Sequence, residues 1–240
     1  MNENLDPTDS GFNNEELEID KALRPLSFDD FAGQDQILNN LKVFVEACNQ
    51  RLDALDHTLF HGPPGLGKTT LAHIVANELG VNLKVTSGPV LDKPGDLAGL
   101  LTNLEPRDVL FIDEIHGLDK DIEEILYQVM DENKISITIG KVGDSNLIEL
   151  DLPKFTIIGA TTLSGMISKP LKDRFGLRIE MESYSKEDMI KILELNTLPG
   201  TICSKGIELL SNNCKQTPRI AKNIGRYCES RRCDFNIGCR

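Results

Sequence analysis

A glycine-rich segment followed by a lysine and a threonine is the part of this sequence best suited to chemistry. Residues 62–69 read GPPGLGKT, which fits the phosphate-loop pattern G-x-x-x-x-G-K-[S/T] and meets every fixed position, unlike an ordinary glycine turn. Gly65 and Gly67 have no side chain to keep the main chain away from a triphosphate, so loop N–H groups and the positive end of the following helix can converge on its oxygens. Lys68 adds a mobile charge for the β- and γ-phosphates, and the Thr69 hydroxyl is placed to bind Mg²⁺.

A pair of carboxylates ends the apolar run at residues 109–112. Asp113 can hold Mg²⁺ through its water shell, whereas Glu114 lies on the other side of the pleat and can polarise an attacking water. In-line attack on a γ-phosphate needs both functions. The alternative interpretation is an acidic strand end at the protein surface.

Two further polar residues each have two interpretations that spacing does not separate. Thr162 ends a strand at residues 156–162, where it can hydrogen-bond a γ-phosphate or the lytic water, or can cap the next segment. Arg174 lies between turn-forming residues, where it can form a surface ion pair or bind a phosphate.

Short apolar runs alternate with helical segments through the middle of the chain. Residues with helical spacing come first, at Leu38, Leu41, Phe44 and Val45. The apolar runs follow at residues 59–60, 83–85, 109–112, 155–158 and 177–179. This order predicts an α/β fold with right-handed crossovers and a mostly parallel sheet, which places ligands at the carboxyl ends of its strands.

One stretch departs from this alternation. Ile135, Ile137 and Ile139 alternate with polar residues, residues 143–146 form a turn, and Ile148 and Leu150 resume the alternation, which predicts a β-hairpin with an apolar stripe. The hairpin either packs on its own domain or projects toward a partner.

The pattern becomes helical from residue 183 onward. Residues 185–188 read SKED, a capping box before a helix, and Thr217 with Pro218 predicts the N-cap and first position of a later helix. On that helix Arg219 shares one face with Lys222 and Arg226. The basic face is either solvated or reaches back to a bound triphosphate. We therefore predict a large domain at residues 21–182 and a small helical lid at residues 183–240.

The overall composition limits what the chain can bind. Residues 1–20 contain seven acidic residues and no Lys or Arg, which predicts a flexible tail. A net charge of -12 repels nucleic-acid phosphates, so we expect weak DNA contact without a partner. The apolar runs are too short to span a bilayer and the acidic start does not fit a signal peptide, so we expect a soluble cytoplasmic protein with no membrane contact.

Together these segments resemble the RuvB family of AAA+ ATPases, which drive Holliday-junction branch migration in bacteria. The likeness runs from Leu23 to about Arg226 and includes the stretches GPPGLGKTT, DVLFIDEIH, LDLPKFTIIGATT, PLKDRFG and TPRIA. It implies ATP and Mg²⁺ as cofactors, with Thr69 and Asp113 at the metal.

The resemblance also implies a role for individual residues. Those that would bind the nucleotide are Leu23, Arg24, Gly62, Gly65, Gly67, Lys68, Thr69, Thr70, Tyr184 and Arg219, with Arg219 as the second sensor. Asp131, Glu132 and Asn133 replace a Glu-Asp-aromatic contact on the adenine side. The hydrolytic residues would be Lys68, Asp113, Glu114, Thr162 as the first sensor, and Arg174 as a finger inserted into a neighbouring subunit's site.

The resemblance finally implies an assembly and a function. Subunits would form a hexameric ring, with the hairpin at about residues 135–150 binding a RuvA-like junction-binding protein, and would act as a helicase-type motor in DNA recombination and repair. Family members continue into a winged-helix DNA-binding domain, whereas this chain stops at Arg240. A nucleotide-gated adaptor or a remnant that cannot translocate DNA is therefore the alternative.

Overall fold

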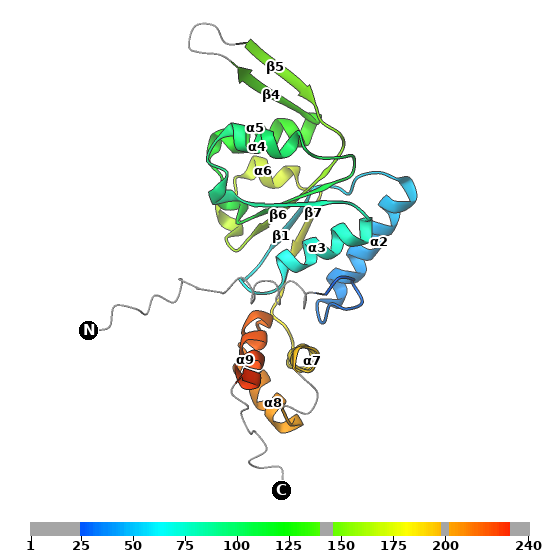
Figure 1. The fold of residues 1–240 in the computed structure, drawn as a ribbon, viewed down its shortest axis with the longest axis vertical. Helices are drawn as coiled ribbons and strands as arrows, with labels where there is room; N and C mark the ends of the chain where they lie inside the picture. Colours follow the sequence, from blue (N-terminus) through cyan, green and yellow to red (C-terminus); the bar gives the residue numbers. More distant parts are fainter. Residues whose placement is uncertain (1–24, 140–145, 198–201, 231–240) are drawn as a thin grey trace, which may run out of the picture.

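The computed structural model describes residues 25–139, 146–197 and 202–230 (Figure 1). The predicted tail and the expected adenine contacts Leu23 and Arg24 lie outside these residues. Every apolar run of the sequence forms a strand of one parallel sheet, so the predicted α/β class is confirmed. In order across the sheet the strands are β2 (Leu83–Ser87), β3 (Val109–Asp113), β6 (Thr156–Thr161), β1 (Thr58–His61) and β7 (Leu177–Glu180).

The register of the sheet brings the ends of its central strands to one edge. Asp113 of β3 pairs with Ser87 of β2, and Thr161 of β6 pairs with His61 of β1. All these pairings are parallel, so every strand exposes its carboxyl end on the same side. The phosphate loop, the acidic pair and Thr162 all follow these strand ends.

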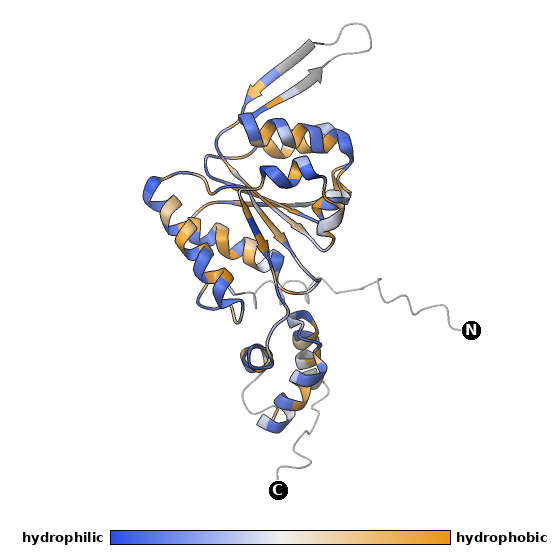
Figure 2. Cartoon of the chain, turned by 180° about the vertical axis from the view of Figure 1, so that it is seen from behind, coloured by the Kyte–Doolittle hydropathy of each residue, from blue (hydrophilic) through white to orange (hydrophobic). Residues whose placement is uncertain are grey.

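Alternate residues of each strand face two different helical layers. Val109 and Phe111 belong to the hydrophobic cluster under the helices at residues 35–51 and 68–79, while Leu110 and Ile112 belong to the cluster under the helices at residues 94–101, 120–132 and 169–174. Figure 2 shows hydrophobic residues in orange on the strands and on the helices of both layers. The helices are α2 (Asp35–Arg51), α3 (Lys68–Leu79), α4 (Pro94–Leu101), α5 (Lys120–Glu132) and α6 (Lys169–Arg174), with short 3-10 turns η1 (Gly88–Val90), η2 (Ile115–Gly117) and η3 (Ser164–Met166). Burial on both faces explains why these strands are continuously apolar.

Helix α2 buries three of the four residues that predicted it. Leu38, Leu41 and Val45 are buried, but Phe44 is 42% exposed. At about 100° per residue, Phe44 lies beyond the edge of the stripe that the other three form with Cys48, so it faces solvent.

The predicted hairpin forms a separate antiparallel sheet of β4 (Lys134–Ile139) and β5 (Asn146–Asp151). Ile135 at its base is 1% exposed and packs into the cluster under α5, whereas its strand partner Leu150 is 37% exposed. The strands run away from the body at the end opposite the last helices (Figure 1). The hairpin thus packs at its base and projects beyond it. Most of the predicted turn lies outside the described residues, and Asn146 belongs to β5.

Three helices follow the sheet: α7 (Lys186–Asn196), α8 (Ser204–Asn213) and α9 (Pro218–Ser230). Ser185 caps α7 by accepting a hydrogen bond from the Asp188 N–H at 3.0 Å. The predicted capping box is changed, because the Asp188 carboxylate accepts from the Ser185 hydroxyl at 2.8 Å. Among the helices described, none combines the length and apolarity needed to cross a membrane.

Candidate functional site

A cavity of about 1050 Å³ lies between the carboxyl edge of the sheet and the last helices. The predicted site residues that line it are Gly65, Gly67, Lys68, Thr69, Thr70, Asp113, Glu114, Thr162, Tyr184 and Arg219. The segment before α2, including Phe31, closes one side of it, and Lys222 with Asn223 of α9 lines another. Most of the predicted site is therefore brought together in one chain.

The phosphate loop has a conformation that requires its glycines. Gly65 and Gly67 have φ angles of 82° and 98°, which disfavour any residue with a Cβ. A Cβ on Gly67 would lie 3.1 Å from Cζ of Phe31, and a Cβ on Gly65 would lie 2.7 Å from Cγ2 of Thr217. Because Gly67 has no side chain to cap α3, the first N–H groups of that helix are available to an anion.

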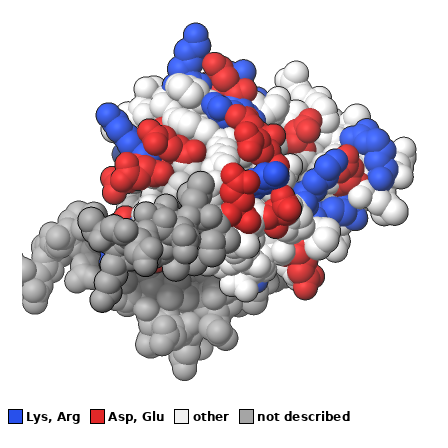
Figure 3. All heavy atoms as spheres, turned by 90° about the horizontal axis from the view of Figure 1, so that it is seen from above, with Lys and Arg blue, Asp and Glu red and all other residues white. Residues whose placement is uncertain are grey.

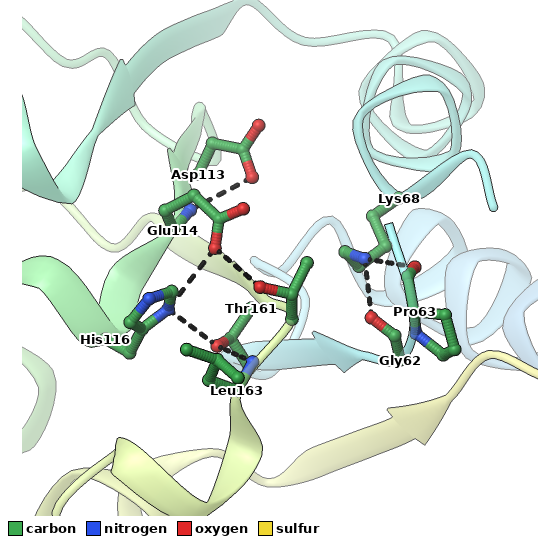
Figure 4. A network of polar contacts seen from close by, with 9 residues as sticks. Gly62, Pro63, Lys68, Asp113, Glu114, His116, Thr161 and Leu163 are labelled. Carbon is green, nitrogen blue, oxygen red and sulfur yellow. Dashed lines mark hydrogen bonds and ion pairs between the residues drawn. The ribbon is translucent and has the colours of Figure 1, made fainter. Parts of the chain in front are cut away.

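Lys68 is held inside its own loop, where it is 7% exposed. Its Nζ donates to the carbonyl oxygens of Gly62 at 2.8 Å and Pro63 at 2.9 Å (Figure 4). Burial lowers the pKa of Lys68, while the Asp113 and Glu114 carboxylates oppose that shift. An anion in the cavity would offset this cost of burying a charge, which makes the loop suited to phosphate. Gly62 does not line the cavity and acts through its carbonyl.

Asp113 and Thr69 form the part of the site suited to a cation. The Thr69 hydroxyl donates to Oδ2 of Asp113 at 3.5 Å. Both supply the oxygen ligands that Mg²⁺ prefers. Within the described residues, no group of three or more His, Cys, Asp or Glu side chains could hold a metal by itself. A cation here would therefore share its coordination with phosphate oxygens, as Mg²⁺ usually does.

Glu114 is placed by a strained turn and by two neighbours. Its φ of 45° lies in the left-handed region, which is uncommon for a residue with a side chain. Thr162 donates to Glu114 Oε2 at 3.3 Å, and His116 Nδ1 lies 3.2 Å from the same oxygen (Figure 4). In this chain Thr162 contacts Glu114, and its expected hydrogen bond to a γ-phosphate or the lytic water stays a prediction. The next segment, η3, has no side-chain cap, and the neighbouring Thr161 Oγ1 accepts from the N–H of its N-cap residue Leu163 at 3.0 Å.

The sequence reasoning missed His116 and Thr161. The sequence feature that could have indicated His116 is its position two residues after Glu114 in the stretch DEIH. Thr161 is the last residue of β6. His116 Nδ1 also lies 2.9 Å from Thr161 Oγ1, a contact across 45 positions of sequence. Only the fold places these groups beside Glu114.

The last helices contact the phosphate loop directly. The N–H of Arg219 donates to the Gly65 carbonyl at 3.4 Å, and the Tyr184 hydroxyl donates to the Leu66 carbonyl at 2.9 Å. Burial raises the pKa of the Tyr184 phenol, so this hydroxyl stays protonated and remains a donor. Of the predicted basic face, Arg219 and Lys222 line the cavity, and the side chain of Arg226 lies outside the described residues.

The helix that carries Arg219 begins where the sequence predicts. The carbonyl of Thr217 accepts from the N–H groups of Ile220 and Ala221, as expected of an N-cap residue. The Thr217 hydroxyl is turned away, because it donates to the Lys215 carbonyl at 3.0 Å. The predicted position is confirmed, but the hydroxyl does not cap the helix.

Arg174 and the segment 131–133 are not part of the cavity of this chain. Arg174 donates from Nε and Nη2 to Asp131 Oδ2 at 2.9 and 2.6 Å, and its guanidinium lies 4.6 Å from the ring centroid of Tyr127. The surface ion pair is thus the interaction that the single chain shows. Asn133 ends α5 in a left-handed conformation, and Asp131 and Glu132 lie in the last turn of that helix. Because α5 covers the sheet face opposite α3, these three residues lie away from the cavity of this chain, and their expected adenine-side contact stays a prediction.

Comparisons with known proteins agree with this geometry. Residues 23–181 match the family model described as the Holliday junction DNA helicase RuvB P-loop domain. The Holliday junction branch migration complex subunit RuvB of Flavobacterium johnsoniae is 57% identical over 228 residues, covering 94% of this chain and 67% of the relative. The subunit of the same name from Campylobacter hominis is 51% identical over 211 residues, covering 87% and 62%.

The solved structures agree as well. The Thermotoga maritima RuvB Holliday junction branch migration motor is 42% identical, with a TM-score of 0.75 over 85% of this chain and 64% of that one. This chain therefore spans about two thirds of the length of the relatives it matches. From its P-loop cavity, its fold and these matches, the chain belongs to the RuvB family.

Proposed function

We propose that this chain hydrolyses ATP with Mg²⁺ as the motor part of a RuvAB-like complex that drives Holliday-junction branch migration in recombination and repair. The observation that carries the proposal is the meeting of three groups in one cavity: the anion-binding loop with Lys68, the Thr69 and Asp113 oxygens, and Glu114. Each function that phosphoryl transfer requires has a residue.

In this proposal each residue of the cavity has a role in ATP hydrolysis that follows from its chemistry. Lys68 and the first N–H groups of α3 bind the phosphates, and Arg219 reaches them from the lid. Thr69 and Asp113 hold Mg²⁺, which when bound neutralises charge on the phosphate oxygens. Glu114 takes the proton of the attacking water, and Thr162 orients that water or the γ-phosphate.

Arg174 acts on a neighbouring subunit in this proposal. Its guanidinium is absent from the cavity of its own chain, yet its side chain is 27% exposed in an ion pair with the half-exposed Asp131. Such a side chain can serve as an arginine finger in a ring of identical subunits, which we propose is hexameric. An arginine finger is worth about 10³ to 10⁵ in rate, so hydrolysis would depend on assembly. Asp131, Glu132 and Asn133 would contribute only next to that interface.

The hairpin and the surface charge define the remaining contacts. The hairpin projects from the body, which suits binding of a RuvA-like partner in the cytoplasm (Figure 1). On the described part of the face seen from above, Asp and Glu gather near the middle, and Lys and Arg lie mostly toward the edges (Figure 3). Together with the net charge of -12, this supports weak DNA contact without the partner.

Substitution of Glu114 tests the proposed chemistry. Glu114→Gln keeps the shape of the side chain but removes the base, so we expect unchanged nucleotide binding and a loss of turnover of about 10² to 10⁴-fold. Glu46→Gln on the exposed side of α2 is the matched control and should change neither quantity. Wild-type turnover in Glu114→Gln would show that the assigned base is wrong.

Mixing of two inactive variants tests the assembly. Arg174→Ala and Glu114→Gln should each be nearly inactive, but in mixed rings an intact cavity of the first variant receives an intact arginine from the second. We expect the mixture to regain turnover. If the mixture stays as inactive as its components, Arg174 does not act across an interface.

A branch-migration assay on a four-way DNA junction, with the RuvA-like partner present, separates the motor from the adaptor. ATP turnover by the wild-type chain without branch migration of the junction would support the adaptor.

A further inference from the structure

The turn that carries Glu114 is held rigidly by its main chain. The Gly117 N–H donates to the Glu114 carbonyl at 2.8 Å, and a Cβ on Gly88 would lie 2.5 Å from that same carbonyl oxygen. Both contacts involve the main-chain carbonyl of Glu114, and neither involves its side chain. The orientation of its carboxylate must therefore be set by side-chain contacts.

The position of one proton on His116 follows from its neighbours. Glu114 Oε2 is a carboxylate oxygen, which only accepts hydrogen bonds, so its 3.2 Å contact with His116 Nδ1 is favourable only if Nδ1 carries a proton. Nδ1 also lies 2.9 Å from Thr161 Oγ1, so with Nδ1 protonated the same proton would be shared between the two oxygens. In the other tautomer, the Nδ1 lone pair would face the carboxylate.

Thr161 continues this contact to the phosphate loop. Its carbonyl accepts from the Gly62 N–H at 3.3 Å. The Gly62 carbonyl in turn accepts from Lys68 Nζ at 2.8 Å (Figure 4). His116 thus ties the carboxylate to the end of β6, and β6 is tied to the loop that holds Lys68.

We propose that His116 is a positioning residue for hydrolysis, which holds the Glu114 carboxylate at a fixed orientation relative to the phosphate loop through Thr161. This inference rests on the proposed role of Glu114 as the base. The contacts with His116 and Thr162 both fall on Oε2, which leaves Oε1 to accept the proton of a water. The side chain of His116 is 16% exposed and that of Glu114 is 41% exposed, so water reaches the base while its support stays sheltered.

Kinetics of two His116 variants test the proposal. His116→Leu removes the donor, whereas an Asn side chain can place an N–H close to the position of Nδ1. We expect His116→Leu to lower kcat by about 10 to 100-fold, the worth of a hydrogen bond to a charged group, with KM and nucleotide affinity unchanged. His116→Asn should recover most of that loss. In a Glu114→Gln background, His116→Leu should cause no further loss, because it acts only through the carboxylate.

The outcomes separate this inference from the proposed function. Wild-type turnover in Glu114→Gln would overturn both. An inactive Glu114→Gln with a fully active His116→Leu would overturn only the role of His116, as would a His116→Leu defect in nucleotide affinity that His116→Asn does not repair. A readout independent of activity is the ¹⁵N spectrum of the histidine rings in the wild-type protein, with the His116 signals assigned by their loss in His116→Asn. We expect the Nδ1–H tautomer, and Nε2–H alone would overturn the proposal.

Discussion

Addition of a single methyl group at Gly65 should separate the lid from the phosphate loop. In Gly65→Ala the new Cβ would lie 2.7 Å from Cγ2 of Thr217 and 3.2 Å from Cβ of Arg219. Two carbon atoms in contact normally lie about 3.5 to 4.0 Å apart, so Thr217 must retreat by about 1 Å. Because Arg219 begins the same helix and its N–H donates to the Gly65 carbonyl, it would be displaced as well.

The expected loss has two parts that can be measured separately. The φ of 82° at Gly65 costs Ala about 1 to 2 kcal/mol of stability, and displacement of a substrate-positioning group by 1 Å can cost about 10²-fold in rate. Gly80→Ala is the matched control, since Gly80 has a φ of 67° but nothing within 4 Å of its Cβ position. Both variants should lose the stability that the backbone conformation costs, Gly65→Ala should lose more because of the clash, and only Gly65→Ala should lose turnover.

Chemical unfolding and ATPase assays on the two variants check this reasoning. A second substitution, Thr217→Ser, removes the methyl group that clashes but keeps the hydroxyl, so it should partly restore the turnover of Gly65→Ala. Arg219 Cβ remains close, and therefore we do not expect full recovery. If Gly65→Ala binds and hydrolyses ATP as well as Gly80→Ala, the contact between lid and loop has no role in catalysis.

Three further changes have defined outcomes. Thr162→Val removes the donor to Glu114, so turnover should fall by about tenfold while nucleotide affinity, measured by calorimetry, stays the same. Tyr184→Phe leaves a buried carbonyl of the phosphate loop without its donor and should lower the free energy of unfolding by about 1 to 3 kcal/mol in urea titrations, and an unchanged value would argue against this hydrogen bond. Burial lowers the pKa of His57 below its ordinary value of 6.5, so the unfolded chain binds more protons below that pH and wild-type stability should fall as the pH drops from there. His57→Asn does not titrate and should show a smaller loss between pH 7 and pH 5, whereas equal losses would contradict the assignment.

The sequence was sufficient to predict the sheet and the positions of the polar residues at its edge. Buried strands must be apolar on both faces, which made the run at residues 109–112 visible, and the carboxyl end of that strand placed Asp113 and Glu114 correctly. The fixed spacing of the phosphate loop likewise placed Lys68 and Thr69 at the start of α3. These are local patterns, in which residues a few positions apart share one physical requirement.

Contacts between distant segments could not be predicted in the same way. Arg174 had two interpretations from spacing, and its ion pair with Asp131 spans 43 positions. The resemblance placed segment 131–133 near adenine, but α5 packs on the other face of the sheet, and Asn133 serves there as a left-handed helix end. His116 was missed because its partner Thr161 lies on a different strand. Each of these contacts depends on packing between distant segments, for which the sequence carries no periodic signal.

The phosphate loop contacts the rest of the protein through main-chain groups, and for this reason the sequence does not predict these contacts. The Gly62 N–H bonds to β6, and the Gly65 carbonyl bonds to the start of α9. Both contacts use main-chain groups of the loop, which every residue except proline supplies in full, so no side chain of the loop marks them. What does mark them is the need for space, because a Cβ at Gly62 would lie 2.5 Å from the Met181 carbonyl oxygen and one at Gly65 would collide with Thr217. Gly65 therefore serves twice, because it lines the cavity on one side and leaves room for the start of α9 on the other, whereas Gly62 leaves room for the segment after β7. If phosphate draws Lys68 away from the Gly62 carbonyl, the loop would move against both β6 and the start of α9. Phosphate binding in the cavity would in this way change the positions of the Glu114 base and of α9 together.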